Sequence, residues 1–104
     1  MSNRFWNPIE ETCGFILKDG TVIEVANIHP DPTRYFRMSE SEIEKHLPEI
    51  DIFWHSHPNG NLNLSLSDYF SFTQYPDHKH RIYGFDDKYA EYYVRRGFVM
   101  RELV

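Results

Sequence analysis

Two histidines separated by a single residue, His55 and His57, are followed further along the chain by an aspartate, Asp68. In an extended strand, residues i and i+2 point to the same side, so the two imidazoles can face one partner together. Asp68, carried back on the start of a helix, can supply a third ligand. Three protein ligands with a fourth position open are the arrangement of a catalytic zinc site. The spacing therefore predicts a catalytic metal centre.

A pair of histidines on a strand can also be hydrogen-bonded or exposed without a metal, and this chain has six histidines. Pro58 directly after the pair and Ser65 three residues before Asp68 make the pattern more specific, so we favour the metal site. Hydrolysis at such a site also needs a carboxylate that takes a proton from water. The available carboxylates are those of Glu10, Glu11, Glu24 and Asp51. Spacing alone does not choose among them.

The length and composition predict one folded globular domain spanning residues 1–104. The chain has 104 residues, of which 40% are hydrophobic and 16% aromatic, enough for one core and too few for two. No apolar stretch is long enough to span a membrane, and residues 1–8 lack the apolar segment of a signal peptide. A single cysteine agrees with a reducing compartment. The formal net charge of −5 argues against nucleic acid as the main partner.

The hydrophobic pattern predicts strands and short helices that position these residues. Strands are expected over 11–17, 21–26, 50–54, 80–85, 91–95 and 98–103, with a further short one at 35–36. One helix is expected after Ser39, with a capping box to Glu42, and a second over 67–74, capped by Ser65 or Ser67. This order predicts an α/β (α+β-like) domain with a mixed, largely antiparallel sheet flanked by short helices.

Several other side chains of reactive types are expected to have structural roles. Cys13 is expected to be a buried strand thiol rather than a nucleophile. His78 and His80 form a second His-x-His pair in a polar turn, which we expect to be exposed. Trp54 and the later tyrosines are expected to pack on a sheet face, although an exposed subset could form a protein interface.

The three segments ETCG at 11–14, HSHP at 55–58 and SLSD at 65–68 together resemble the signature of JAMM (MPN+) metalloproteases. The resemblance implies a JAMM-type fold with one Zn²⁺ per chain, held by His55, His57 and Asp68. It further implies that Glu11 is the general acid/base and that Ser65 helps to hold the oxyanion. The implied activity is hydrolysis of a peptide or isopeptide bond in a protein substrate.

Within that family, residues 28–39 (IHPDPTRYFRMS) are most similar to bacteriophage tail assembly proteins of the lambda K type. Asn27, Pro32 and Phe36 also resemble the family. This similarity implies other phage tail proteins as partners, in the host cytoplasm or in the virion tail. Little sequence precedes Glu11, so we expect the leading helix of the family to be short or missing and one flank of the sheet to be less covered.

Three functions are compatible with these residues. The first is a zinc metallopeptidase acting in phage tail assembly. The second is a structural tail component that keeps the fold without cleavage, and the third is a cellular protease that trims ubiquitin-like or sulfur-carrier proteins. A purely structural zinc site needs no base, so the complete set of Glu11, ligands and Ser65 favours an enzyme.

Overall fold

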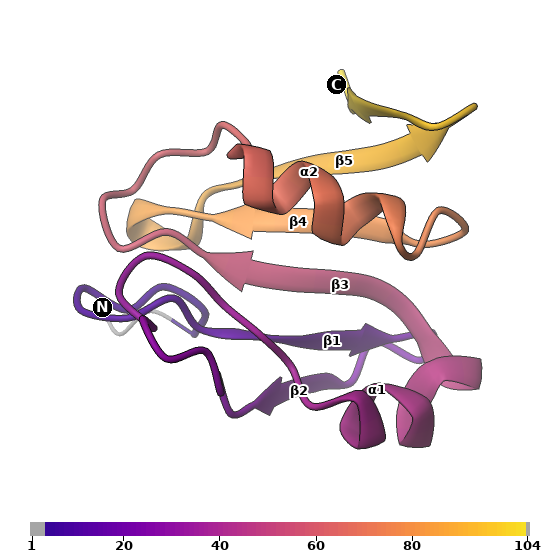
Figure 1. Ribbon diagram of the computed structural model, residues 1–104, viewed down its shortest axis with the longest axis horizontal. Helices are drawn as coiled ribbons and strands as arrows, with labels where there is room; N and C mark the ends of the chain where they lie inside the picture. The colour runs from indigo at the N-terminus through magenta and orange to yellow at the C-terminus, as the bar shows by residue number, and fades with distance from the viewer. Residues whose placement is uncertain (1–3, 104) are drawn as a thin grey trace.

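A six-stranded sheet with the order β2-β1-β3-β4-β5-β6 forms the centre of the molecule (Figure 1). The computed structural model describes residues 4–103. The elements are β1 (Cys13–Leu17), β2 (Val22–Val25), α1 (Glu40–His46), β3 (Ile50–Ser56), α2 (Leu66–Thr73), β4 (Lys79–Tyr83), β5 (Tyr89–Arg95) and β6 (Phe98–Arg101). Among the strands of residues 4–103, only β3 and β4 pair in parallel, and every other neighbouring pair is antiparallel. The expected α/β class with a mixed, largely antiparallel sheet is confirmed.

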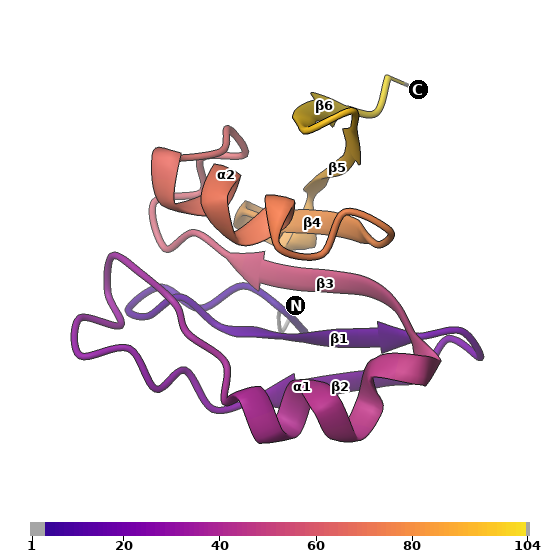
Figure 2. The ribbon, with the colours of Figure 1, turned by 45° about the vertical axis from the view of Figure 1, so that its right-hand side comes forward.

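Both helices lie on one face of the sheet (Figures 1 and 2). Ile43 of α1 belongs to a buried cluster with Phe15 of β1 and Phe53 of β3. Phe72 of α2 belongs to a second cluster, with Ile82 of β4 and Tyr92 of β5. The helix α2 also makes the crossover between the two parallel strands, as a parallel connection requires. The first turn of α2 therefore sits beside the end of β3.

The opposite face of the sheet is partly covered by residues 4–7, which lie ahead of β1. The Phe5 ring stacks on Tyr83 at 3.9 Å and meets the edge of Trp54 at 4.8 Å. The backbone N–H groups of Phe5 and Trp6 donate to the Asp87 carboxylate at 3.1 and 3.0 Å. Where we expected a less covered flank, this short segment provides the aromatic cover.

Two local expectations are wrong. Residues 35–36 form no strand, because the backbone around them bonds to the Asn27 side chain. Ser39 is the N-cap of α1 but makes no side-chain capping bond, since its hydroxyl bonds to that of Ser41 at 2.8 Å. Of the two caps expected for the second helix, Ser65 and Ser67, the structure shows Ser65.

Candidate metal centre

The structure brings Glu11, His55, His57 and Asp68 together from three separate parts of the fold. Glu11 lies two residues before β1, the histidines are at the end of β3, and Asp68 is in the first turn of α2. One ligand atom from each residue lies within 4.8 Å of those of the others. All four residues are buried, with exposed fractions of 6%, 1%, 9% and 3% in that order. This group can hold a metal ion.

Glu11 reaches the histidines because the pairing between β1 and β3 continues ahead of the first residue of β1. Cys13 is paired with His55 in the register of the sheet. The Ser56 N–H donates to the Thr12 carbonyl at 2.9 Å, and the Thr12 N–H donates to the Ser56 hydroxyl at 3.0 Å. The backbone on the C-terminal side of Glu11 is thereby fixed against the strand that carries both imidazoles.

The Asn27 side chain fixes Glu11 from its other side. Its amide nitrogen donates to the carbonyls of Glu11 and Tyr35 at 2.8 and 2.9 Å. Its amide oxygen accepts from the N–H groups of His29 and Arg37 at 3.1 and 3.0 Å. The Glu11 N–H donates to the Pro32 carbonyl at 2.8 Å. The resemblance singled out Asn27 and Pro32, and the structure places both against Glu11.

The spacing of the ligand atoms fits a tetrahedral metal ion. His55 Nε2 lies 2.9 Å from Asp68 Oδ1, and His57 Nε2 lies 3.1 Å from Asp68 Oδ2. The two Nε2 atoms are 3.2 Å apart. Ligands at about 2.0–2.1 Å from a tetrahedral zinc are separated from one another by about 3.3 Å. The cluster therefore needs little rearrangement to accept such an ion.

A backbone carbonyl sets the orientation of His57. Its Nδ1–H donates to the Asn61 carbonyl at 2.6 Å, so in the neutral imidazole Nε2 carries the lone pair. The Trp6 indole N–H donates to the carbonyl of His57 at 3.0 Å. Sequence reasoning missed Asn61, because a backbone carbonyl leaves no signal in the residue type. Trp6 and Asp87 were also missed, since their roles depend on contacts between distant parts of the chain.

Ser65 and Asp68 form a capping box at the start of α2. The Asp68 carboxylate oxygen that faces His57 also accepts from the Ser65 N–H at 2.9 Å. The Ser65 hydroxyl accepts from the Asp68 N–H at 3.1 Å. Ser65 is exposed, and its own O–H remains able to donate to a group at the mouth of the site.

The charges in the cluster are strongly perturbed by burial and by one another. Burial raises the pKa of Glu11 to about 8, with His57 opposing and Asp68 adding to the rise. Burial disfavours ionisation of Asp68 too, but the His55 charge and hydrogen bonds from both imidazoles and from Ser65 hold its pKa well below the usual range. Burial also lowers the pKa of His55. For His57, burial lowers the pKa, but the hydrogen bond and charge of Asp68, the Asn61 carbonyl and the Glu11 charge together outweigh burial and raise the pKa.

The remaining candidates lie outside the cluster. Cys13 is fully buried, and burial raises the pKa of its thiol to about 12, as expected for a structural cysteine. The expectation of an exposed pair at 78–80 is wrong. His80 is 2% exposed, with its ring stacked on Phe72 at 4.5 Å, and its Nε2–H donates to the Tyr75 carbonyl at 3.0 Å. Burial lowers the pKa of His80 to about 4.

Comparison with known proteins supports the fold. No family model matches this chain, and no curated protein does. The chain is similar to the solution structure of protein DSY2949 from Desulfitobacterium hafniense, a structural genomics target, with a TM-score of 0.67. The identity is 20% over 91% of this chain and 76% of that chain, so the likeness concerns the fold alone. No helix within residues 4–103 is long and apolar enough to cross a membrane.

Proposed function

We propose that this protein is a zinc-dependent peptidase of the JAMM type. The observation that carries the proposal is the position of the Glu11 carboxylate beside the three ligand side chains. Its Oε1 atom is buried and has no hydrogen-bond partner within the described part of the chain. A buried polar atom without a partner costs free energy, so such an atom points to a function that uses it. A base that receives a proton from water is such a function.

Zinc is the metal that the donor set favours. Two imidazole nitrogens and one carboxylate oxygen are typical of catalytic zinc sites, which leave one position open. Magnesium and calcium prefer sites made of oxygen ligands. The carbonyl of Asn61 orients His57 in the way that outer hydrogen bonds orient zinc ligands.

The protein groups can perform hydrolysis as follows. A bound zinc ion would supply a Lewis acid that lowers the pKa of water and polarises a carbonyl. Glu11 takes a proton from the attacking water and later delivers it to the amine nitrogen as the scissile C–N bond breaks. The Ser65 O–H donates to the oxygen on which negative charge develops. The products are a carboxylate and a free amine.

Phage tail assembly is the setting that we propose, with other tail proteins as substrates or partners. It is supported by the resemblance of residues 28–39 to tail assembly proteins of the lambda K type. The two other candidate settings make different predictions. A structural tail component would be found in purified virions and would not need Glu11, whereas a cellular trimming enzyme would cleave a small carrier protein near its end.

The decisive experiment combines metal content with cleavage. We expect about one zinc per chain in the purified protein, measured by mass spectrometry of the metal, and loss of that zinc in Asp68→Ala. Cleavage is measured as new amino termini in a pool of peptides from a bacterial protein digest. Glu11→Gln should keep zinc and lose cleavage, while Glu24→Gln, at an exposed position of β2, should keep both. Failure of the parent protein to take up zinc would overturn the proposal.

A further inference from the structure

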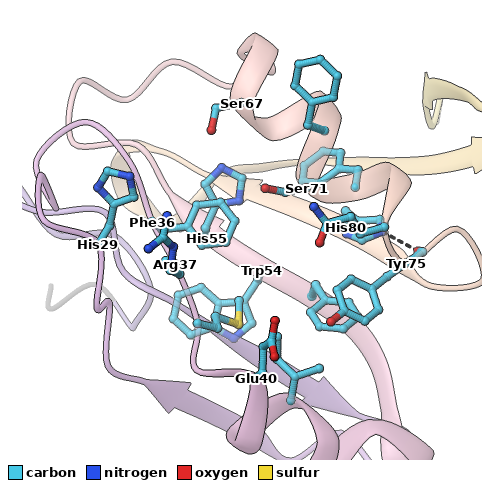
Figure 3. A pocket seen from close by; sticks show the side chains of 16 residues that line it. His29, Phe36, Arg37, Glu40, Trp54, His55, Ser67, Ser71, Tyr75 and His80 are labelled. Atoms are coloured by element: carbon cyan, nitrogen blue, oxygen red, sulfur yellow. Dashed lines mark hydrogen bonds between the residues drawn. The ribbon is translucent and has the colours of Figure 1, made fainter.

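A cavity of about 390 Å³ lies beside the metal centre, between α2 and the segment 29–43 (Figure 3). Polar and apolar side chains contribute about equally to its lining. Among the lining residues are large apolar side chains from both helices, β3 and the connecting segments: Phe36, Met38, Ile43, Phe53, Phe72 and Tyr75. Ligand sites in proteins are commonly hollows of this size and character with a few polar groups.

The ring of a metal ligand forms part of the wall of this cavity. His55 lines the cavity and stacks on Phe36 with ring centres 4.2 Å apart. The same ring meets the edge of Phe72, at 5.9 Å. Its Nε2 atom belongs to the ligand cluster. A side chain seated in the cavity would thus be separated from the metal centre by the width of one imidazole.

The charged groups around the cavity do not select one sign of charge. Arg37 and Glu40 both line it and both are exposed, and Figure 3 shows them at separate places on the wall opposite α2. Ser67 and Ser71 line the α2 side and can hydrogen-bond to a peptide backbone. Phe70 lines the cavity as well, although its side chain is 59% exposed. An exposed aromatic ring at a cavity is well suited to an apolar ligand.

We propose that this cavity is a specificity pocket that holds a large apolar side chain of the residue next to the cleaved bond. The proposal rests on the proposed function and adds a substrate class to it: polypeptides with an aromatic or long aliphatic residue at the cleavage site. The cavity has room for a large side chain together with part of the neighbouring peptide backbone, large apolar side chains from both helices and β3 line part of it, and it adjoins the ligand cluster through His55. The balanced charges disfavour a substrate chosen by a charged residue.

The test compares cleavage of peptides that differ at one position on either side of the scissile bond. Peptides with Phe, Leu or Met at one of these positions should have a kcat/KM at least tenfold higher than those with Gly or Asp. Narrowing the pocket with Ser71→Trp should reduce this preference at least tenfold. Gln74→Trp, at a second lining position, should reduce the preference in the same way and provides the test if Ser71→Trp does not fold. Ser41→Trp, an exposed position on α1, is the matched control.

A binding measurement separates failure of this proposal from failure of the proposed function. The probe is N-acetyl-phenylalanine amide, with N-acetyl-glutamine amide as its polar counterpart, followed by NMR shifts of backbone amides. We expect shifts at Phe36, Ser71 and Gln74 with the phenylalanine probe only, lost in Ser71→Trp. If peptides are cleaved without side-chain preference, the pocket proposal is overturned and the peptidase stands. If no peptide is cleaved, the proposed peptidase function is overturned. Binding of the phenylalanine probe would then still support the pocket, and absence of binding would overturn it.

Discussion

Ser65 and Asp68 hold each other through two reciprocal hydrogen bonds, each from the backbone N–H of one residue to the side chain of the other, at 2.9 and 3.1 Å. One of these bonds occupies the carboxylate oxygen that faces His57. The cap of α2 and the third ligand are therefore a single unit. A change at the cap should affect both the stability of the helix and the placement of the ligand.

Ser65→Ala is predicted to lower the free energy of unfolding by about 1 kcal/mol, because it removes the side-chain cap. Ser39→Ala is the matched control and should cost much less, since Ser39 is an N-cap without a side-chain capping bond. Ser65→Gly should cost only a few tenths of a kcal/mol, or ~0.3 kcal/mol, yet lose the hydroxyl donor. Urea unfolding measures the stabilities. If Ser65→Gly cleaves peptides as fast as the parent, the hydroxyl has no role in the reaction.

The contribution of Glu11 to the stability of the metal-free protein should fall as the pH rises from about 4.5 to about 8. The pKa of Glu11 is raised by burial from 4.5 to about 8 in the folded state. Within this range the unfolded chain releases the proton while the folded protein retains it, so rising pH favours unfolding. The effect is fully developed above the folded pKa. Each pKa unit corresponds to about 1.4 kcal/mol, so a change of a few kcal/mol is expected.

Thermal melting at several pH values, in the presence of a chelator, measures this effect. Glu11→Gln should remove most of the decline, because glutamine has no proton to lose, and its advantage over the parent should widen towards pH 8. Glu24→Gln, on an exposed face of β2, should follow the parent curve. A constant difference between Glu11→Gln and the parent across the range would show that Glu11 titrates normally.

Asn27→Ala should lower the free energy of unfolding by about 2–4 kcal/mol, because its side chain makes four hydrogen bonds to backbone groups. It should also slow cleavage with zinc still bound, since Asn27 holds the backbone of Glu11 and touches no ligand. Asn63→Ala, at an exposed loop position, is the matched control. Metal content and peptide cleavage measured on the same samples would separate the two effects. Loss of zinc in Asn27→Ala would contradict this role.

Gly14→Ala should destabilise the protein by about 2–3 kcal/mol through overpacking. A Cβ atom at this position would lie 1.9 Å from the Ile23 carbonyl oxygen of β2, so backbone would have to move. Gly20→Ala is the comparison, because its site is open but its φ of +90° is unfavourable for alanine. That change should cost about 1–2 kcal/mol. Equal losses in the two variants, measured by chemical unfolding, would argue against a close strand contact at Gly14.

Much of the fold could be predicted from the sequence because the local signals agree with the tertiary structure. The apolar run at 50–54 is a buried strand, and it continues through His55 to Ser56. The resemblance alone chose Glu11 among four candidate carboxylates, whereas the spacing of His55, His57 and Asp68 predicted the three ligands. Their convergence follows from the alternation of β3 and the helix start at Ser65.

The errors arose where several local bonding patterns are close in free energy. Ser39 could bond to Glu42 or to its neighbour Ser41, and the sequence contains both partners. The stretch at 35–36 has strand composition, but the Asn27 side chain takes up the backbone groups that a strand would use. The polar sequence around His80 predicted an exposed side chain. In the structure His80 lies on β4 and packs against the rings of Phe53 and Phe72, which keep it buried.

The parallel pairing of β3 with β4, closed by the α2 crossover, has a kinetic consequence. The ligand cluster is complete only when β1 has paired with β3 and α2 has returned over the sheet. Contacts between such distant parts of a chain form late in folding. A metal that binds only the finished cluster should leave the refolding rate nearly unchanged and slow unfolding instead. The ion would then stabilise the completed fold without taking part in the folding nucleus.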